Sequence, residues 1–388
     1  RSVSRGLGDV YKRQSQNNMT ENKQHWLFFY GDGNNHDVNF ARLPDPPPWR
    51  EFKKIEESEL KQLEKQWQNI QNLANSDDNK RGREKGEKFR VYSSEIAEED
   101  DSEKPLVNVV DAVNAAIYLR RPLLVTGNPG SGKTSLAYAI AQELKLGPVL
   151  NWPITARSTL VDGLYRYDAI ARLQDAQLNK EKSQNIGQYI TLGPVGTAFL
   201  PSLYPRVLLI DEIDKSDINL PNDLLHLFEE GRFQIPELVR WADKSQTSYK
   251  NDQATEVKVR TEDVGIKVCI IRGRVHCSSF PIVVMTSNGE RDFPPAFVRR
   301  CLRIRMPDPD AAALQTIIKA HFQDEEQSEN LKRTTEELIE TFLKKDEQER
   351  ATDQLLNAVY IRNNLSPEAF TDDLEALLLK GLSTMDEF

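Results

Sequence analysis

The sequence contains only three cysteines, Cys269, Cys277 and Cys301, and no C-x-x-C pair. Zinc sites and redox motifs usually place two cysteines close together, so we expect neither here and predict buried thiols among apolar neighbours. No apolar run approaches the roughly 18 residues of a membrane-spanning helix. No charged leader followed by an apolar core opens the chain, and we therefore expect a cytoplasmic protein.

An excess of positive charge is also missing. Lys and Arg number 51 against 60 Asp and Glu, which gives a formal net charge of −9. A surface that mainly neutralises nucleic-acid phosphates needs the opposite balance, so nucleic acid is not expected as the main partner, although a local basic pore would remain compatible. With 388 residues, 38% of them hydrophobic, the chain is long enough for about two or three domains.

The first part of the chain is expected to lie outside the main domain. Residues 1–18 have no helical or strand periodicity and precede Met19, so we expect them to be non-native. Residues 19–104 form an N-terminal extension with one amphipathic helix, which either packs on the main domain or serves as a partner-binding arm. The polar stretch 75–104 is expected to be a solvated linker. The helix is predicted from apolar residues at spacings of three and four: Leu60, Leu63, Trp67, Ile70 and Leu73.

The remaining chain predicts an α/β core followed by a helical domain. In residues 105–306 the short apolar runs "PLLVT", "RVLLI" and "FPIVVMT" fit strands buried on both faces, which is typical of a parallel sheet. Helical segments separate these runs, so the predicted class is α/β. After Pro307 the pattern becomes wholly helical, and residues 307–388 are expected to form a small helical domain.

A glycine-rich motif follows the first predicted strand. "GNPGSGKT" fits G-x-x-x-x-G-K-[ST] and opens a predicted helix. Its glycines let backbone N–H groups turn toward phosphate oxygens, and the helix N-terminus adds partial positive charge. Lys133 would reach the β- and γ-phosphates of ATP, and the Thr134 hydroxyl would bind Mg²⁺. The expected nucleotide-binding residues are Gly127, Asn128, Pro129, Gly130, Ser131, Gly132, Lys133, Thr134 and Ser135.

Two carboxylates end the second apolar run, "RVLLIDEIDKSD". Ligands of open α/β sheets bind at the carboxyl ends of the strands, which is where Asp211 and Glu212 are predicted to lie. Asp211 would complete the Mg²⁺ site, and Glu212 would orient or deprotonate the attacking water. A strand followed by an acidic helix cap is the alternative interpretation.

The third apolar run ends in Thr286, Ser287 and Asn288. Asparagine after a strand is commonly a turn residue, but an amide here could also hold the attacking water or contact the γ-phosphate. Because Asn288 follows the other two motifs in order, we interpret it as a catalytic residue.

Taken together, "GNPGSGKT", "LLIDEID", "TSN" and "PPAFVRRC" resemble the P-loop, Walker B, sensor 1 and arginine-finger elements of AAA+ ATPases. More narrowly, "GPVGTAFLPSLYPRVLLIDEIDKSDINLPNDLLHLFEEGRFQIPE" is similar to the MoxR family. This resemblance covers about residues 106–382 and implies a P-loop AAA+ core with a C-terminal helical lid. It also implies a β-hairpin inserted ahead of Walker B, and "EVKVRT" predicts a further hairpin before the sensor strand.

The resemblance assigns roles to three arginines. One arginine before a short strand would reach the ATP site of the neighbouring subunit, and alignment by "PPAF" gives Arg300, with Arg299 as the alternative. Such a finger is worth about 10³ to 10⁵ in rate. A sensor 2 arginine would contact the γ-phosphate from the lid, and Arg350 is the nearest candidate, although its position is offset.

The resemblance also implies a function and partners. The chain would be a Mg²⁺-dependent ATPase that works as a homo-hexameric ring and remodels a protein partner in a chaperone-like way. Proteins with a von Willebrand factor A domain are common partners of the family. Two other classes remain open: a nucleotide-gated switch or scaffold in a bacterial signalling or conflict system, and a nucleic-acid translocase.

Overall fold

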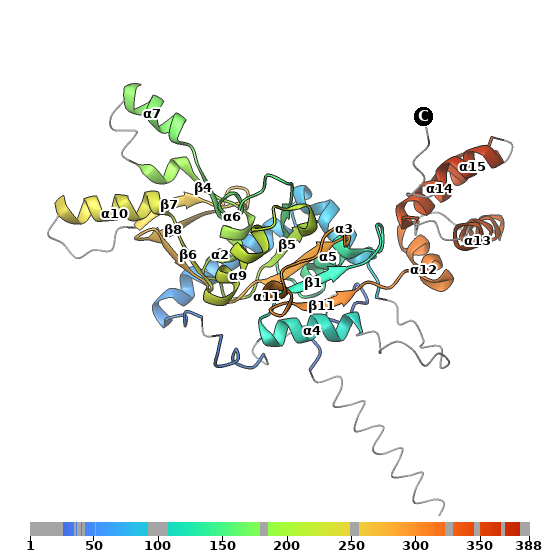
Figure 1. Cartoon of the computed structure of the whole chain (residues 1–388), viewed down its shortest axis with the longest axis horizontal. Coiled ribbons are helices and arrows are strands. Elements are labelled where there is room, and N and C mark those ends of the chain that lie inside the picture. Colours follow the sequence, from blue (N-terminus) through green and yellow to red (C-terminus); the bar gives the residue numbers. More distant parts are fainter. Residues whose placement is uncertain are drawn as a thin grey trace, which may run out of the picture.

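The computed structural model shows an α/β core with a helical domain at its C-terminal end (Figure 1). Residues 1–18 and residues 92–104 of the predicted linker lie outside the described residues. The structure describes residues 26–34, 36, 40, 43–50, 52–91, 108–178, 185–248, 256–322, 329–344, 350–365 and 369–380. Within these ranges, no helix combines the length and the apolar character that crossing a bilayer requires.

Five parallel strands form the central sheet, in the order β11-β1-β10-β5-β2. Every neighbouring pair is non-consecutive in the chain, so each connection crosses over, and the predicted parallel α/β core is confirmed. The strands are short and apolar because both faces are buried; all six residues of β10 are buried. Their bounds are β1 (Leu123–Thr126), β2 (Leu150–Pro153), β5 (Val207–Asp211), β10 (Ile282–Ser287) and β11 (Leu302–Arg305).

Helices cover both faces of this sheet and create two apolar cores. On one face, Leu136 and Ile140 of α5 (Lys133–Glu143) join Leu123 and Val125 of β1 in a fully buried cluster. On the other face, the cluster includes Leu208 and Phe228. The remaining core helices are α4 (Val109–Leu119), α6 (Leu160–Leu164), η4 (Ile186–Tyr189), α8 (Pro194–Ala198), η5 (Ile213–Lys215), α9 (Leu220–Glu230) and α11 (Pro295–Val298).

The two predicted insertions meet in a second sheet of six strands, ordered β3-β4-β7-β8-β9-β6. In the first insertion β3 and β4 pair antiparallel, but α7 (Ala169–Leu178) lies between them, so they are not joined as a plain hairpin. α7 and α10 (Pro236–Ser248) extend away from the core (Figure 1). The strands are β3 (Tyr165–Tyr167), β4 (Ile190–Leu192), β6 (Arg232–Gln234), β7 (Glu256–Arg260), β8 (Lys267–Ile271) and β9 (Arg274–His276).

The second insertion contains the predicted hairpin. β7 and β8 pair antiparallel, and buried residues alternate with exposed ones along both strands, as a half-buried hairpin requires. Cys269 lies on the outward side of β8 and is exposed, which corrects the prediction that all three cysteines are buried. Cys277 and Cys301 are buried, and burial raises the pKa of both thiols to about 12.

The N-terminal extension packs on the core over much of its length. In α2 (Glu57–Ala74) Leu63 and Ile70 are buried, and Gln71 Nε2 donates to the Lys145 carbonyl of the core at 2.6 Å, so this helix packs on the core. The residues after it correct the prediction of a solvated linker, because α3 (Lys80–Lys88) packs on α5. The close approach depends on Gly86, where an added Cβ would lie 2.6 Å from the carbonyl oxygen of Tyr138. A 3₁₀ turn, η2 (Asp77–Asn79), joins the two helices.

The C-terminal helices have a core of their own. Leu314, Leu338, Leu355 and Val359 are buried in it, which confirms the predicted helical C-terminal region. These helices lie to one side of the central sheet (Figure 1). Their bounds are α12 (Ala311–His321), α13 (Glu329–Lys344), α14 (Thr352–Asn364) and α15 (Asp372–Leu378).

A buried carboxylate fixes the first described segment to the core. Glu143, the last residue of α5, is fully buried; it accepts the Gly31 backbone N–H at 3.0 Å and also that of Tyr30. Burial raises the pKa of this carboxyl to about 7, against the opposing effect of the two backbone hydrogen bonds. Asp32 nearby raises this pKa further, and His36 lowers it.

The raised pKa of Glu143 makes stability depend on pH. Between pH of about 4.5 and about 7 the folded chain keeps a proton that the unfolded chain has lost, so stability falls as pH rises. We expect the free energy of unfolding of wild type, measured with urea, to fall by about 3 kcal/mol across this pH range relative to that of Glu143→Gln. Glu64→Gln, which changes an exposed carboxylate on α2, is the matched control. If the difference in free energy of unfolding between wild type and Glu143→Gln stays constant with pH, the raised pKa of Glu143 is contradicted.

Candidate functional site

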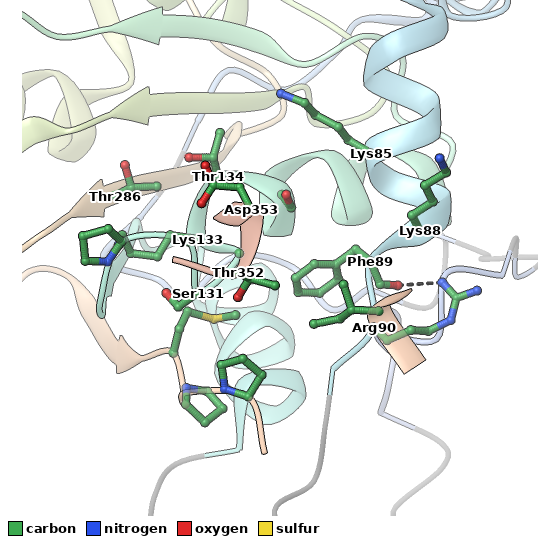
Figure 2. A pocket seen from close by; sticks show the side chains of 18 of the residues that line it. Lys85, Lys88, Phe89, Arg90, Ser131, Lys133, Thr134, Thr286, Thr352 and Asp353 are labelled. Atoms are coloured by element: carbon green, nitrogen blue, oxygen red, sulfur yellow. Dashed lines mark hydrogen bonds between the residues drawn. The ribbon is translucent and has the colours of Figure 1, made fainter. Parts of the chain in front are cut away.

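A cavity of about 470 Å³ lies where the P-loop, the ends of the central strands, the N-terminal extension and the lid come together. Figure 2 shows side chains that line it from these different parts of the chain. The residues predicted from the sequence that line the cavity are Pro129, Gly130, Ser131, Gly132, Lys133, Thr134, Ser135, Asp211, Glu212 and Asn288. Three motifs far apart in the sequence therefore meet at one edge of the sheet, as parallel strands require.

The P-loop turns tightly into α5. Gly132 has a φ of 86°, a left-handed conformation that favours glycine, and it directly precedes the helix. Gly130 also has positive φ, and an added Cβ would lie 2.6 Å from the Thr352 backbone nitrogen of the lid. This geometry presents the N-terminus of α5 to the cavity, which favours an anionic ligand.

Lys133 lies folded back over the loop. Its Nζ donates to the carbonyl oxygens of Gly127 at 2.7 Å and Asn128 at 2.8 Å. Burial lowers the pKa of Lys133, while the carboxylates of Asp214 and Asp211 oppose this shift. Gly127 and Asn128 thus contact Lys133 through their backbone carbonyls. The side-chain amide of Asn128 instead donates to the Asp308 carboxylate.

One oxygen of Asp211 joins two motifs. Asp211 Oδ1 accepts a hydrogen bond from Thr134 Oγ1 at 2.9 Å and from Thr286 Oγ1 at 2.6 Å. The carboxylate and the Thr134 hydroxyl are the hard oxygen donors that Mg²⁺ prefers, and the ion takes few protein ligands. The donor pair would therefore suit a magnesium ion, which Thr134 and Asp211 would hold.

Glu212 has an uncommon backbone conformation. Its φ of 60° is left-handed, and its backbone N–H donates to Thr286 Oγ1 at 2.8 Å. Its side chain accepts from Lys215 Nζ at 2.8 Å, and both side chains are partly exposed. This conformation costs energy in a non-glycine residue, so the surrounding structure must hold it in place. Residues held in this way are often found at functional sites.

Asp214 supports the turn that carries Asn288, and the sequence analysis missed it. Its Oδ2 accepts the backbone N–H groups of Asn288 at 2.8 Å and Glu290 at 3.2 Å. Asp214 is 4% exposed, and its Oδ1 has no hydrogen-bond partner in the part of the chain that the structure describes. The only sequence signal was its place two residues after Glu212.

The two candidate finger arginines lie outside the cavity of their own chain. Arg300 Nε donates to the carboxylate of Glu229 at the end of α9, and its Nη1 donates to the Ala296 carbonyl at 3.2 Å. Arg299 Nε donates to the Pro295 carbonyl at 3.3 Å. Among the described residues that line the cavity, neither arginine appears.

Arg350 is also placed elsewhere. Its Nη1 donates to the carbonyls of Thr341 and Phe342, in the last turn of α13, at 3.0 and 2.9 Å. The guanidinium thus binds a helix C-terminus, where cations are stabilised by the helix dipole, and it does not line the cavity. The lid lines the cavity with other residues: Ile317, His321, Thr352, Asp353 and Leu356.

One wall of the cavity comes from the N-terminal extension, which sequence reasoning did not find. No motif marks this wall, and the only hint was an aromatic residue, Phe89, within a polar stretch. In Figure 2, Phe89, Lys88 and Arg90 lie on the opposite side of the cavity from Thr286 and Lys133. The wall consists of Lys85, Lys88, Phe89, Arg90 and Val91.

The central part of the chain matches a known protein family. Residues 123–308 match the family model described as ATPase family associated with various cellular activities (AAA). No curated protein matches the chain at a significant level. Among solved structures, the AAA domain of FIGL-1 in complex with ADP is similar, with 15% sequence identity and a TM-score of 0.29. That match covers 66% of this chain and 64% of the FIGL-1 chain.

Removal of the Asp214 carboxylate tests its support of Asn288. We expect Asp214→Ala to lower the rate of ATP hydrolysis by about 10², because the Asn288 turn loses its anchor, while ATP affinity changes little. Steady-state kinetics and equilibrium binding of ATP measure the two effects separately. Asp223→Ala, which removes an exposed carboxylate of α9, is the control. Unchanged hydrolysis in a folded Asp214→Ala protein would remove Asp214 from this role.

Proposed function

We propose that the chain hydrolyses Mg-ATP and uses the energy for chaperone-like remodelling of a protein partner in the cytoplasm. Residues 123–308 match the model of the AAA ATPase family, which supports the ATPase activity. The proposal follows the MoxR-like sequence pattern around Walker B. The observation that carries it is the convergence of Lys133, Thr134, Asp211, Glu212 and Asn288 on one cavity.

The contacts of each residue support a specific role. Lys133 is close enough to the loop to exchange its two carbonyl acceptors for phosphate oxygens. Thr134 and Asp211 would hold Mg²⁺, which when bound neutralises charge on the phosphates. Glu212 would break its ion pair with Lys215 and then orient or deprotonate the attacking water, with the Asn288 amide nearby.

Binding and hydrolysis should separate in two variants. Lys133→Ala should lose ATP affinity, because the phosphates lose their cation, whereas Glu212→Gln should bind ATP but hydrolyse it at least about 10² times more slowly. Fluorescent-ATP binding and phosphate release measure the two properties. Lys61→Ala, at an exposed position on α2, is the control for the lysine. Hydrolysis by Glu212→Gln at the wild-type rate would rule out the assigned role.

We further propose a ring, with a hexamer as the expected form, in which Arg300 completes the site of the neighbouring subunit. The supporting observation is that Arg300 lies outside its own cavity and is held by Glu229 at a partly exposed position. The ion pair between them would open when Arg300 meets the phosphates of the next subunit. Arg299 is the alternative finger.

Mixed assemblies test action between subunits. Arg300→Ala and Lys133→Ala chains should each be inactive alone, but mixing them should restore part of the ATPase activity, because some sites receive an intact lysine and an intact finger. Mixtures with Arg299→Ala in place of Arg300→Ala show which arginine is required. No recovery at any ratio, with mixed assembly confirmed by crosslinking, would contradict a shared site.

Exposed apolar residues on α7 support a protein as the partner. Ile170, Leu173 and Leu178 are 71%, 63% and 85% exposed on a helix that stands off the core (Figure 1). Apolar residues so exposed are typical of surfaces that contact other proteins. A protein with a von Willebrand factor A domain is the partner that the MoxR resemblance favours.

A nucleotide-gated switch or scaffold is the second candidate function, and one observation favours it. None of the described lid residues that line the cavity is an arginine. Without a lid arginine on the γ-phosphate, hydrolysis would be slow and would time a signal. If the chain remodels its partner, adding the partner should speed ATP hydrolysis. If the chain is a switch, the partner should not change the rate.

A further inference from the structure

We propose that the N-terminal extension is part of the nucleotide site: residues 85–91 bind the base end of the nucleotide through Phe89, and nucleotide binding locks the extension onto the core. This inference rests on the proposed ATP site. It goes further because these residues lie outside the segment 123–308 that matches the AAA family. We call residues 85–91 the extension wall.

The position of Phe89 fits contact with an aromatic base. The residue is 8% exposed, and its ring lies within van der Waals distance of the place where a Cβ on Gly132 would be, at 3.4 Å. Phe89 therefore lies next to the P-loop, on the side of the cavity away from Thr286 (Figure 2). The cavity also has apolar lining residues suited to a base rather than to phosphates: Val91, Val109, Met306, Ile317 and Leu356.

Two supports hold the extension wall against the core. The first is α3, which packs on α5; Gly86 lies against the Tyr138 backbone, and Lys85 Nζ lies 5.2 Å from the centre of the Tyr138 ring. The extension wall is thus attached, through α3, to α5, the helix whose N-terminus faces the cavity. A shift of α5 on nucleotide binding would be transmitted to the wall.

The second support is the loop around Gly31. The Val91 backbone N–H donates to the Gly31 carbonyl at 2.8 Å, and Gly31 in turn donates to Glu143 Oε2 at 3.0 Å. Gly33 has positive φ, and a Cβ there would collide with the guanidinium of Arg90. The Arg90 side chain at the end of the wall therefore packs closely against the loop.

The lid closes the opposite side of the same space. His321, the last residue of α12, lines the cavity together with Lys88 of the extension wall. Burial lowers the pKa of His321, and the positive charge of Lys88 lowers it further. Ile317 and Leu356 of the lid line the cavity together with Phe89. A bound base would thus contact the wall and the lid together, and occupancy would favour the docked extension by the same free energy that docking adds to binding.

Affinity measurements on the full chain test the base contact. We expect Phe89→Ala to weaken ATP binding by about tenfold, because the base loses an aromatic contact surface. Binding of inorganic triphosphate, which has no base, should stay unchanged, and Phe89→Trp should retain ATP affinity. Lys133→Ala should weaken both ligands, which separates the base end from the phosphate end.

Three results would overturn the inference. Equal losses of ATP and triphosphate in Phe89→Ala would mean that Phe89 only supports the fold, and no loss of either would mean that the base lies elsewhere. Wild type that binds triphosphate and ATP equally well would also exclude a base contact. Failure of wild type to bind either ligand would instead contradict the proposed ATP site itself.

Hydrogen exchange of the wild-type chain tests the locking without any variant. ATP should slow exchange of the Val91 amide and of the Gly31 amide, both of which are hydrogen bonded within the docked extension. Inorganic triphosphate should slow them less. Exchange of these amides that is the same with and without saturating ATP would overturn the proposed locking.

Discussion

A single carboxylate oxygen holds the site together. Asp211 Oδ1 accepts hydrogen bonds from Thr134, at the start of α5, and from Thr286, at the end of β10. The Thr286 hydroxyl in turn accepts the backbone N–H of Glu212. Because the strands are parallel, their carboxyl ends share one edge of the sheet, and these short contacts fix the three motifs relative to each other. The position of the Asp211 carboxylate thus depends on the register of the strands.

Helix α5 carries that arrangement to the N-terminal extension. It begins at Lys133 in the cavity and ends at Glu143, whose buried carboxylate holds the loop around Gly31. That loop holds Val91, which lines the same cavity as Lys133. Both ends of one helix are therefore connected to the cavity.

The sequence predicted the features whose signal is local. A P-loop needs its glycines, lysine and threonine within one turn, and buried parallel strands need short apolar runs, so both could be located from residues close together. The extension wall could not be predicted, because α3 is polar and its packing on α5 depends on Gly86 meeting the backbone of Tyr138. The MoxR resemblance implied Arg350 at the phosphates, although with an offset. Its guanidinium instead donates to the Thr341 and Phe342 carbonyls at the end of α13.

The proposed function depends most directly on nucleotide binding in the cavity. Isothermal titration of the full chain with ATP, in Mg²⁺ and again in excess EDTA, measures this. We expect one ATP bound per chain in Mg²⁺ and clearly weaker binding without the ion, since Thr134 and Asp211 would hold it against the phosphates. Absence of ATP binding in both conditions, by a chain shown to be folded, would contradict the proposed function.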